Sequence, residues 1–229
     1  MCGRFAQTPA LQSLFSRYKF FGEDEAGVVP CYNIAPTQSV PVIFRDDEGD
    51  HLDAMRWGLV PHWSKEIGTK PLFNARAETV ATKPSFRTPF KRHRCLVPAT
   101  GFYEWKKGAK NTKIPYFIHN KDESPMVFAG LWDRWDQQDG TILHSFTIIT
   151  TRPNVTMKPI HDRMPVILSE EAEDTWLDPN QHDPDHLTPL LNPSDPELIE
   201  AYPVSSEVNS ASHEGEGCII HAPSQGDLF

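Results

Sequence analysis

The chain lacks the features that mark membrane, secreted and metal-binding proteins. Its 229 residues contain no stretch approaching the ~20 consecutive apolar residues of a membrane span. The N-terminus has no basic segment followed by an apolar one, so no secretory signal is predicted. The cysteines are few and lie far apart, without a CxxC pair or a Cys/His metal spacing. We therefore expect reduced thiols, no metal or other cofactor, no membrane association, and a monomer in the cytoplasm.

Basic residues are absent from residues 166–229, which carry 14 Asp and Glu. Residues 1–165 carry all 22 Lys and Arg against 17 Asp and Glu, so the net charge of −9 divides into +5 and −14. Ten basic residues and only two acids fall within 76–113. This asymmetry indicates a polyanion-binding face on the body of the protein and a solvating acidic portion from about residue 166. A charged surface without any partner explains the same distribution.

The hydrophobic pattern predicts one α+β domain over residues 1–229, with a mostly antiparallel, barrel-like sheet flanked by a few helices. No regular β-α alternation or internal repeat is present. The apolar and β-branched runs predict strands at 39–45, 51–57, 94–106 (two strands around a glycine turn), 114–119, 126–132, 141–150 and, briefly, 165–168. Helical spacing or capping residues predict helices at 8–21, 74–82 and 169–177, and the segments 22–38, 58–71 and 203–229 read as irregular.

Cys2 is the most informative single residue. Removal of Met1 would leave it with a free α-amine beside its thiol, and their reference pKa values of roughly 7.7–8.0 and 8.5 give both groups a nucleophilic fraction near neutrality. Such a pair traps an aldehyde, because the amine forms an imine and the sulfur then closes a five-membered thiazolidine. Alternatively, the amine acts as the base for its own thiol, as in N-terminal nucleophile hydrolases. A chance Met-Cys start is the simplest alternative.

Three further residues have side chains suited to proton transfer or orientation. Glu104 lies in the aromatic strand GFYEW, where period-two alternation puts it on the face of Phe102, and apolar surroundings raise a carboxyl pKa. His161 is a candidate proton shuttle. Asn74 suits substrate orientation by hydrogen bonds. Each has a structural alternative: a rim ion pair for Glu104, a core or capping role for His161, and a helix cap for Asn74.

Another set of residues suits contact with a nucleic acid. Arg4, Arg76 and Arg163 each lie two residues along the chain from one of the candidate residues, namely Cys2, Asn74 and His161. Guanidinium groups match phosphate oxygens in bidentate geometry. Trp63 lies in the turn-rich WGLVPHW segment, from which an exposed indole stacks on unpaired bases. The loop residues Asn33 and Pro36 are candidates for positioning a ligand. Each also has a structural alternative. The arginines would form surface ion pairs, the tryptophan would pack in the core, and the two loop residues would stabilise a turn.

Together these segments resemble the SOS-response-associated peptidase (SRAP) family of abasic-site proteins. The resemblance runs in order over nearly the whole chain, and seven motifs in register make it specific. They are MCGRF at 1–5, YNIAPTQ at 32–38, WGLVPHW at 57–63, NARAET at 74–79, GFYEWKK at 101–107, IHDRMPVIL at 160–168 and PVSSEVN at 203–209.

The resemblance implies a channel for single-stranded DNA in which Cys2 forms a thiazolidine crosslink with the ring-opened aldehyde of an abasic site. It implies that Asn74 holds the Cys2 amine or the sugar, that Glu104 moves protons, and that His161 stabilises or protonates the opened deoxyribose. Arg4, Arg76 and Arg163 would bind flanking phosphates, and Trp63 would pack on nearby nucleotides. It also implies self-removal of Met1 and a lyase or crosslink-reversal step.

Two other functions stay open. A glutamine amidotransferase-like hydrolase would use the same Cys2 on an amide. A non-covalent reader of single-stranded or modified DNA would need only the basic region and exposed Trp side chains, and its binding would be salt-sensitive and indifferent to Cys2.

Overall fold

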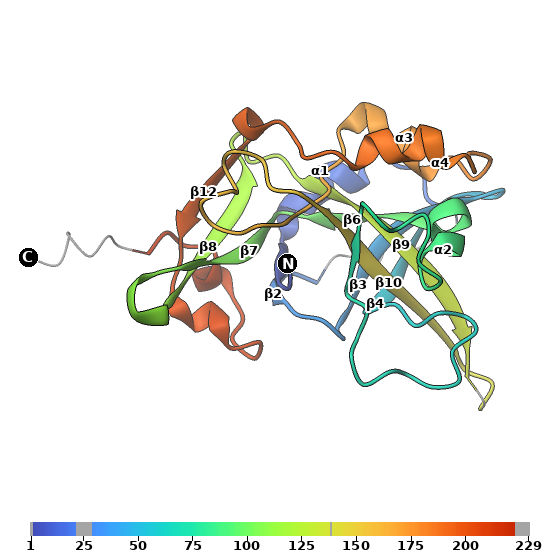
Figure 1. Cartoon of the computed structure of the whole chain (residues 1–229), viewed down its shortest axis with the longest axis horizontal. Coiled ribbons are helices and arrows are strands. Elements are labelled where there is room, and N and C mark those ends of the chain that lie inside the picture. The colour runs from blue at the N-terminus through green and yellow to red at the C-terminus, as the bar shows by residue number, and fades with distance from the viewer. Residues whose placement is uncertain (1, 22–28, 138, 223–229) are drawn as a thin grey trace, which may run out of the picture.

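A closed five-stranded barrel forms the centre of the molecule. A computed structural model describes residues 2–21, 29–137 and 139–222 (Figure 1). The barrel strands are β3 (Ser39–Asp46), β4 (Gly49–Trp57), β6 (Arg94–Ala99), β9 (Met126–Asp136) and β10 (Ile142–Thr151). The order is β10-β4-β3-β6-β9, and β9 pairs with β10, which closes the barrel. Closure leaves these five strands without a free edge.

A second sheet lies against the barrel and holds the N-terminal segment. Its order is β12-β8-β7-β1-β2, and neighbouring strands are antiparallel. These strands are β1 (Phe5–Gln7), β2 (Cys31–Ile34), β7 (Gly101–Lys107), β8 (Lys113–Asn120) and β12 (Ile199–Pro203). Because β1 is the fourth strand of this order, residues 2–4 enter the molecule beside β7.

Short elements complete the fold. β5 (Asn74–Arg76) and β11 (Met164–Pro165) attach to β10. The α-helices are α1 (Gln12–Phe15), α2 (Arg87–Arg92), α3 (Glu170–Leu177) and α4 (Pro184–Leu187). The 3₁₀ turns are η1 (Pro9–Leu11), η2 (Ala109–Asn111), η3 (Thr188–Leu191), η4 (Pro196–Leu198), η5 (Ser206–Asn209) and η6 (Glu216–Cys218). None of the helices among the described residues is long and apolar enough to cross a bilayer.

The predicted fold class is confirmed, while several predicted elements are wrong. The barrel strands lie where the sequence pattern placed them. The helix predicted over 74–82 is instead strand β5 followed by turns, because residues 74–76 pair with β10. The helix predicted over 8–21 is confined to η1 and α1. The predicted loop 22–38 contains β2, and its residues 22–28 lie outside the described part of the chain.

The acidic C-terminal portion is folded onto the barrel rather than merely solvated. Trp176 and Leu177 of α3, Leu187 of α4 and Leu191 of η3 are buried in the same apolar cluster as Phe90 and Leu96. In Figure 1, α3 and α4 cover the top of the barrel, whereas the loop 58–72 lies at the bottom. Most charged residues of this portion therefore lie on the outer surface of a packed layer, while Glu173 is buried and paired with Arg17.

Arg94 ties this layer to the barrel. Its side chain, on β6, is 4% exposed and donates to four carbonyls: those of Phe90 (3.0 Å) and Lys91 (2.7 Å), and those of Trp176 (2.6 Å) and Asp178. Burial lowers the pKa of Arg94 to about 10. The rigid fork of a guanidinium reaches several carbonyls at once, which a Lys ammonium does not.

Arg94→Lys should therefore lower the free energy of unfolding by about 2 kcal/mol, because some of these buried carbonyls lose their donor. Urea denaturation followed by tryptophan fluorescence measures the change. Arg92→Lys, at an exposed position two residues earlier, is the matched control and should leave stability within about 0.5 kcal/mol. Equal effects of the two substitutions would contradict the anchoring role of Arg94.

Candidate active site

Cys2 lies completely buried at the junction of the barrel and the second sheet. Its neighbours in the apolar cluster include Phe5, Trp57 and Phe102. The β1–β7 pairing places this segment, because Phe5 pairs with Phe102 and the Tyr103 N–H donates to the Arg4 carbonyl at 2.9 Å. Burial raises the pKa of the Cys2 thiol well above its usual range, and the negative charge of Glu104 adds to the shift. The thiol is therefore protonated at neutral pH.

Glu104 is a buried carboxyl group on the same face of β7 as Phe102. Its side chain is 2% exposed, while Tyr103 and Trp105 pack in the separate cluster on the other face, as the period-two pattern predicts. Burial raises the pKa of Glu104, and the charge of His161 opposes part of that shift. A carboxyl group with a raised pKa both donates and accepts protons closer to neutral pH than an exposed one.

His161 faces Glu104 from the loop that follows β10. Its Nε2 lies 3.8 Å from Glu104 Oε2. The backbone N–H of Arg163 donates to His161 Nδ1 at 3.0 Å, which helps to fix the orientation of the ring. The exposed Asp162 carboxylate lies 3.1 Å from the same Nδ1. The loop thus orients the imidazole with Nδ1 toward residues 162 and 163 and Nε2 toward Glu104.

Asn74 lies at the first position of β5 and contacts Cys2. Its Nδ2 donates to the Cys2 carbonyl at 2.7 Å, whereas the family resemblance implied a contact with the Cys2 amine or a sugar. Its Oδ1 is buried and has no hydrogen-bond partner among the described residues. Asn74 therefore fixes the main chain at Cys2, and its Oδ1 is a buried acceptor beside that contact. The helix-cap alternative fails because residue 74 begins a strand.

Arg163 is held inside the protein by an ion pair. Both of its terminal nitrogens donate to the carboxylate of Glu78, with Nη2 to Oε2 at 3.0 Å, and Nη2 also donates to the Thr150 carbonyl. The Arg163 side chain is 14% exposed. Sequence reasoning missed Glu78, although it lies two residues after Arg76 in the NARAET motif. The pair connects that motif to the loop that carries His161.

Arg4 and Asn33 bind the C-terminal segment. Arg4 Nη1 donates to Asn33 Oδ1 at 2.7 Å and to the Val208 carbonyl at 2.9 Å. Asn33 is fully buried, and its Nδ2 donates to the carbonyls of Ser210 (2.9 Å) and His213 (2.8 Å). Direct ligand contact by Asn33, as predicted, does not fit this burial. Asn33 instead positions Arg4 and the segment that follows η5.

The remaining predicted contact residues lie at the surface. Arg76 is exposed, Pro36 is partly exposed, and the Trp63 side chain is 58% exposed on the loop between β4 and β5. Another aromatic candidate emerges at Trp105, whose Nε1 donates to Asn209 Oδ1 at 2.7 Å and whose ring lies 5.9 Å from the Arg4 guanidinium carbon. The pairing of GFYEW with PVSSEVN across the sequence is a tertiary contact that local pattern does not reveal.

Potential metal ligands do not gather at Cys2. Among the described residues, the group that brings three ligand atoms within 4.8 Å of one another consists of Asp46, Glu48 and His51, at the β3–β4 turn. The residues around Cys2 supply one thiol, one carboxyl group and one imidazole, and the imidazole Nδ1 is already an acceptor for the Arg163 N–H. This set suits nucleophilic attack with proton transfer.

The fold and the site define an α+β protein with a buried cysteine near its N-terminus. The Asn74 amide holds the cysteine main chain, and the Glu104 carboxyl group and the His161 imidazole face each other beside it. Comparisons with known proteins agree with this class. The family model for SOS response associated peptidase (SRAP) matches residues 1–211. The chain belongs to the SRAP family.

Relatives and solved structures extend the match to nearly the whole chain. The chain is 46% identical over 215 residues to the abasic site processing protein YoqW of Bacillus subtilis, covering 92% of this chain and 95% of that protein. It is 34% identical to the abasic site processing protein HMCES of Rattus norvegicus, covering 84% of this chain and 65% of that protein. A crystal structure of a Bacteroides thetaiotaomicron protein superposes with a TM-score of 0.85 at 30% identity, covering 97% of this chain and 100% of that chain.

Proposed function

We propose that this protein processes abasic sites in single-stranded DNA by capturing them covalently on Cys2. The observation that carries the proposal is the set of contacts around Cys2: Asn74 holds its carbonyl at 2.7 Å, and His161 lies 3.8 Å from Glu104. The names of relatives such as YoqW and HMCES support the choice of substrate.

The proposed reaction begins at the α-amine that removal of Met1 would free. This amine attacks the C1′ aldehyde of the ring-opened deoxyribose, and the carbinolamine loses its hydroxyl as water, with Glu104 as the proton donor. The Cys2 sulfur then adds to the imine carbon while its proton passes through Glu104 to the nitrogen. Amine, thiol and aldehyde give a thiazolidine and one water. Because the thiol is protonated in its buried site, the amine acts first.

The other residues have supporting roles in this proposal. His161 exchanges protons with Glu104 and with the opened sugar, which also suits reversal or elimination at the same site. Asn74 Oδ1 accepts from the amine or a sugar hydroxyl. Arg76 contacts backbone phosphate, and Trp63 and Pro36 contact nucleotides beside the lesion. Arg4 and Arg163, which are bound inside the protein, position the segments around the site. Hydrolysis of the Met1–Cys2 bond by the same residues would generate the reactive amine.

A denaturing gel and an intact-mass measurement test the proposal. Protein mixed with single-stranded DNA that carries one abasic site should give a band of protein plus oligonucleotide, with a mass lower than their sum by one water. A borohydride-reduced abasic site, which has no aldehyde, should give no such band. Absence of the band with the aldehyde substrate would overturn covalent capture. Equal salt-sensitive binding of both substrates would favour the non-covalent reader, and glutaminase activity without DNA would favour the hydrolase.

Glu78→Gln should slow crosslinking about tenfold, which corresponds to 1.4 kcal/mol, without weakening DNA binding. Gln retains the size of Glu78 but removes the negative charge that holds Arg163, so the loop that orients His161 loses its anchor. Single-turnover crosslinking and fluorescence anisotropy with intact single-stranded DNA separate rate from affinity. If Arg163 acts only on phosphate, the substitution should tighten binding and leave the rate unchanged. Glu171→Gln, the same change at an exposed position on α3, is the control and should leave the crosslinking rate unchanged.

A further inference from the structure

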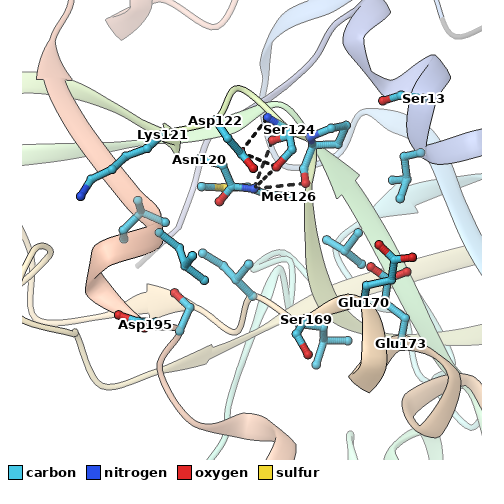
Figure 2. Close-up of a pocket in the computed structure, with 18 of the residues that line it drawn as sticks. Ser13, Asn120, Lys121, Asp122, Ser124, Met126, Ser169, Glu170, Glu173 and Asp195 are labelled. Atoms are coloured by element: carbon cyan, nitrogen blue, oxygen red, sulfur yellow. Dashed lines mark hydrogen bonds between the residues drawn. The ribbon is translucent and has the colours of Figure 1, made fainter.

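A large cavity lies on a part of the molecule that the proposed chemistry does not use. It has a volume of about 670 Å³ and is lined by residues of α1, the β8–β9 turn, the start of α3, and the segment from residue 194 to the start of β12 (Figure 2). None of the residues assigned above to Cys2 chemistry or DNA contact lines it. Ligand-binding clefts typically enclose roughly 300–1,000 Å³.

The floor of the cavity is apolar. Leu14, Met126, Val127, Leu168 and Ile199 line it, and each is at most 7% exposed. At the rim, Leu198 is 60% exposed. A floor of this kind accommodates an apolar side chain, and the exposed leucine adds contact area at the mouth.

The rim carries an excess of negative charge. Five acids line the cavity, namely Asp122, Glu170, Glu173, Asp195 and Glu197, against the two bases Arg17 and Lys121. Figure 2 shows Asp122, Asp195 and Glu170 on different sides of the opening. Both bases are already paired, Arg17 with Glu170 and Glu173, and Lys121 with Glu197 at 3.6 Å.

Two of the rim acids have no basic partner within ion-pair distance among the described residues. The Asp122 carboxylate accepts from the N–H and hydroxyl of Ser124, and these bonds lower its pKa. Asp195 accepts the Glu197 N–H at 2.9 Å. Both carboxylates are exposed, so the rim attracts cations and repels a DNA backbone.

We propose that this cavity docks a short basic segment of another protein, with an apolar side chain in the floor and flanking Lys or Arg residues against the acidic rim. The charge of the rim and the apolar floor together select this occupant over an anion or a purely apolar ligand. Because the cavity and the proposed DNA contacts share no residue, docking and DNA binding would be compatible.

The test uses three labelled peptides, KKLLKK, KKSSKK and EELLEE, with affinity measured by anisotropy and location by amide chemical shifts. KKLLKK should perturb the amides of α1, the β8–β9 turn and residues 194–199, and it should bind at least tenfold more tightly than either other peptide. The triple variant Asp122→Asn, Asp195→Asn and Glu197→Gln should weaken KKLLKK about tenfold, because it removes three exposed negative charges from the rim. Asp47→Asn, Glu66→Gln and Asp136→Asn together form the matched control and should change affinity less than twofold.

Several results would overturn the proposal. One is that KKLLKK leaves the cavity amides unperturbed up to ~1 mM. Another is that KKSSKK binds as tightly as KKLLKK, and a third is that the cavity triple variant binds KKLLKK with unchanged affinity. Spermidine that perturbs the same amides as strongly as KKLLKK would indicate a polyamine site instead. Concentration-dependent dimerisation in sedimentation velocity that the cavity triple variant abolishes would indicate a second copy of the chain as the occupant.

Discussion

Cys2→Ala should abolish the heat-stable crosslink to abasic DNA, lowering its yield by at least ~10³-fold. A Cys2→Ala protein prepared with residue 2 as its N-terminus keeps the α-amine but lacks the sulfur that closes the ring. An imine still forms in principle, yet water hydrolyses it under denaturing conditions. The proposal therefore separates two products, a reversible imine that needs only nitrogen and a thiazolidine that needs both atoms.

Cys2→Ser sharpens this test because a hydroxyl replaces the thiol with little change in volume. Its crosslink should appear only when borohydride is present to reduce the imine, whereas the wild-type band should need no reductant. Cys31→Ser is the matched control: Cys31 is partly exposed on β2 and donates to Glu214, a contact that a hydroxyl preserves. A borohydride-independent band of wild-type intensity from Cys2→Ser would contradict the role of the sulfur.

The N-terminus itself provides a second control. A protein with residues added before Cys2 that are not removed has an amide nitrogen there, which does not form an imine. Its stable crosslink should fall as far as that of Cys2→Ala, and intact mass reports whether the N-terminus is free. A blocked protein that still crosslinks at the wild-type level would show that another nucleophile reacts.

Local sequence pattern predicted the parts of the site that depend on strand geometry. The alternation in GFYEW placed Glu104 on the face of Phe102, and its 2% exposure in the structure excludes the alternative of a rim ion pair. The pattern could not predict that 74–76 forms a strand, because its partner β10 lies about seventy residues later. Propensity is a weak prior when main-chain pairing with a distant strand competes with it.

The prediction that three arginines contact phosphate agrees least with the structure, because it depends on charge partners that the sequence does not reveal. A sequence gives the charge of Arg4 and Arg163 but not their partners, and both guanidinium groups are bound inside the protein. Of the three predicted arginines, only Arg76, the last residue of β5, is exposed as a phosphate contact requires. The cavity between α1, α3 and η4 was likewise invisible, because its lining comes from segments that are separate in the sequence.

Glu104→Gln should slow crosslink formation by about 10²–10⁴-fold, the usual contribution of a general acid–base group. Gln retains the shape and a hydrogen-bonding oxygen, but it neither protonates the leaving hydroxyl nor accepts the thiol proton. The wild-type rate of the dehydration step should fall as pH rises through the raised pKa of Glu104, because the acid form is lost. The rate of the Gln variant should lack this dependence, which a pH series of single-turnover reactions measures.

The same substitution should stabilise the fold at neutral pH, which separates loss of chemistry from loss of structure. Burial raises the pKa of Glu104, so the folded state holds this proton more tightly than the unfolded chain, where the pKa is about 4.3. The stability that this proton contributes is complete below the unfolded pKa and is lost as pH rises through the folded pKa. Gln has no such loss, so its melting temperature should exceed that of wild type by roughly 2–4 °C at pH 7 and match it at pH 4. Two results would contradict this role of Glu104. One is a Glu104→Gln protein that crosslinks at the wild-type rate. The other is a melting temperature of the variant, relative to wild type, that is lower at pH 7 than at pH 4.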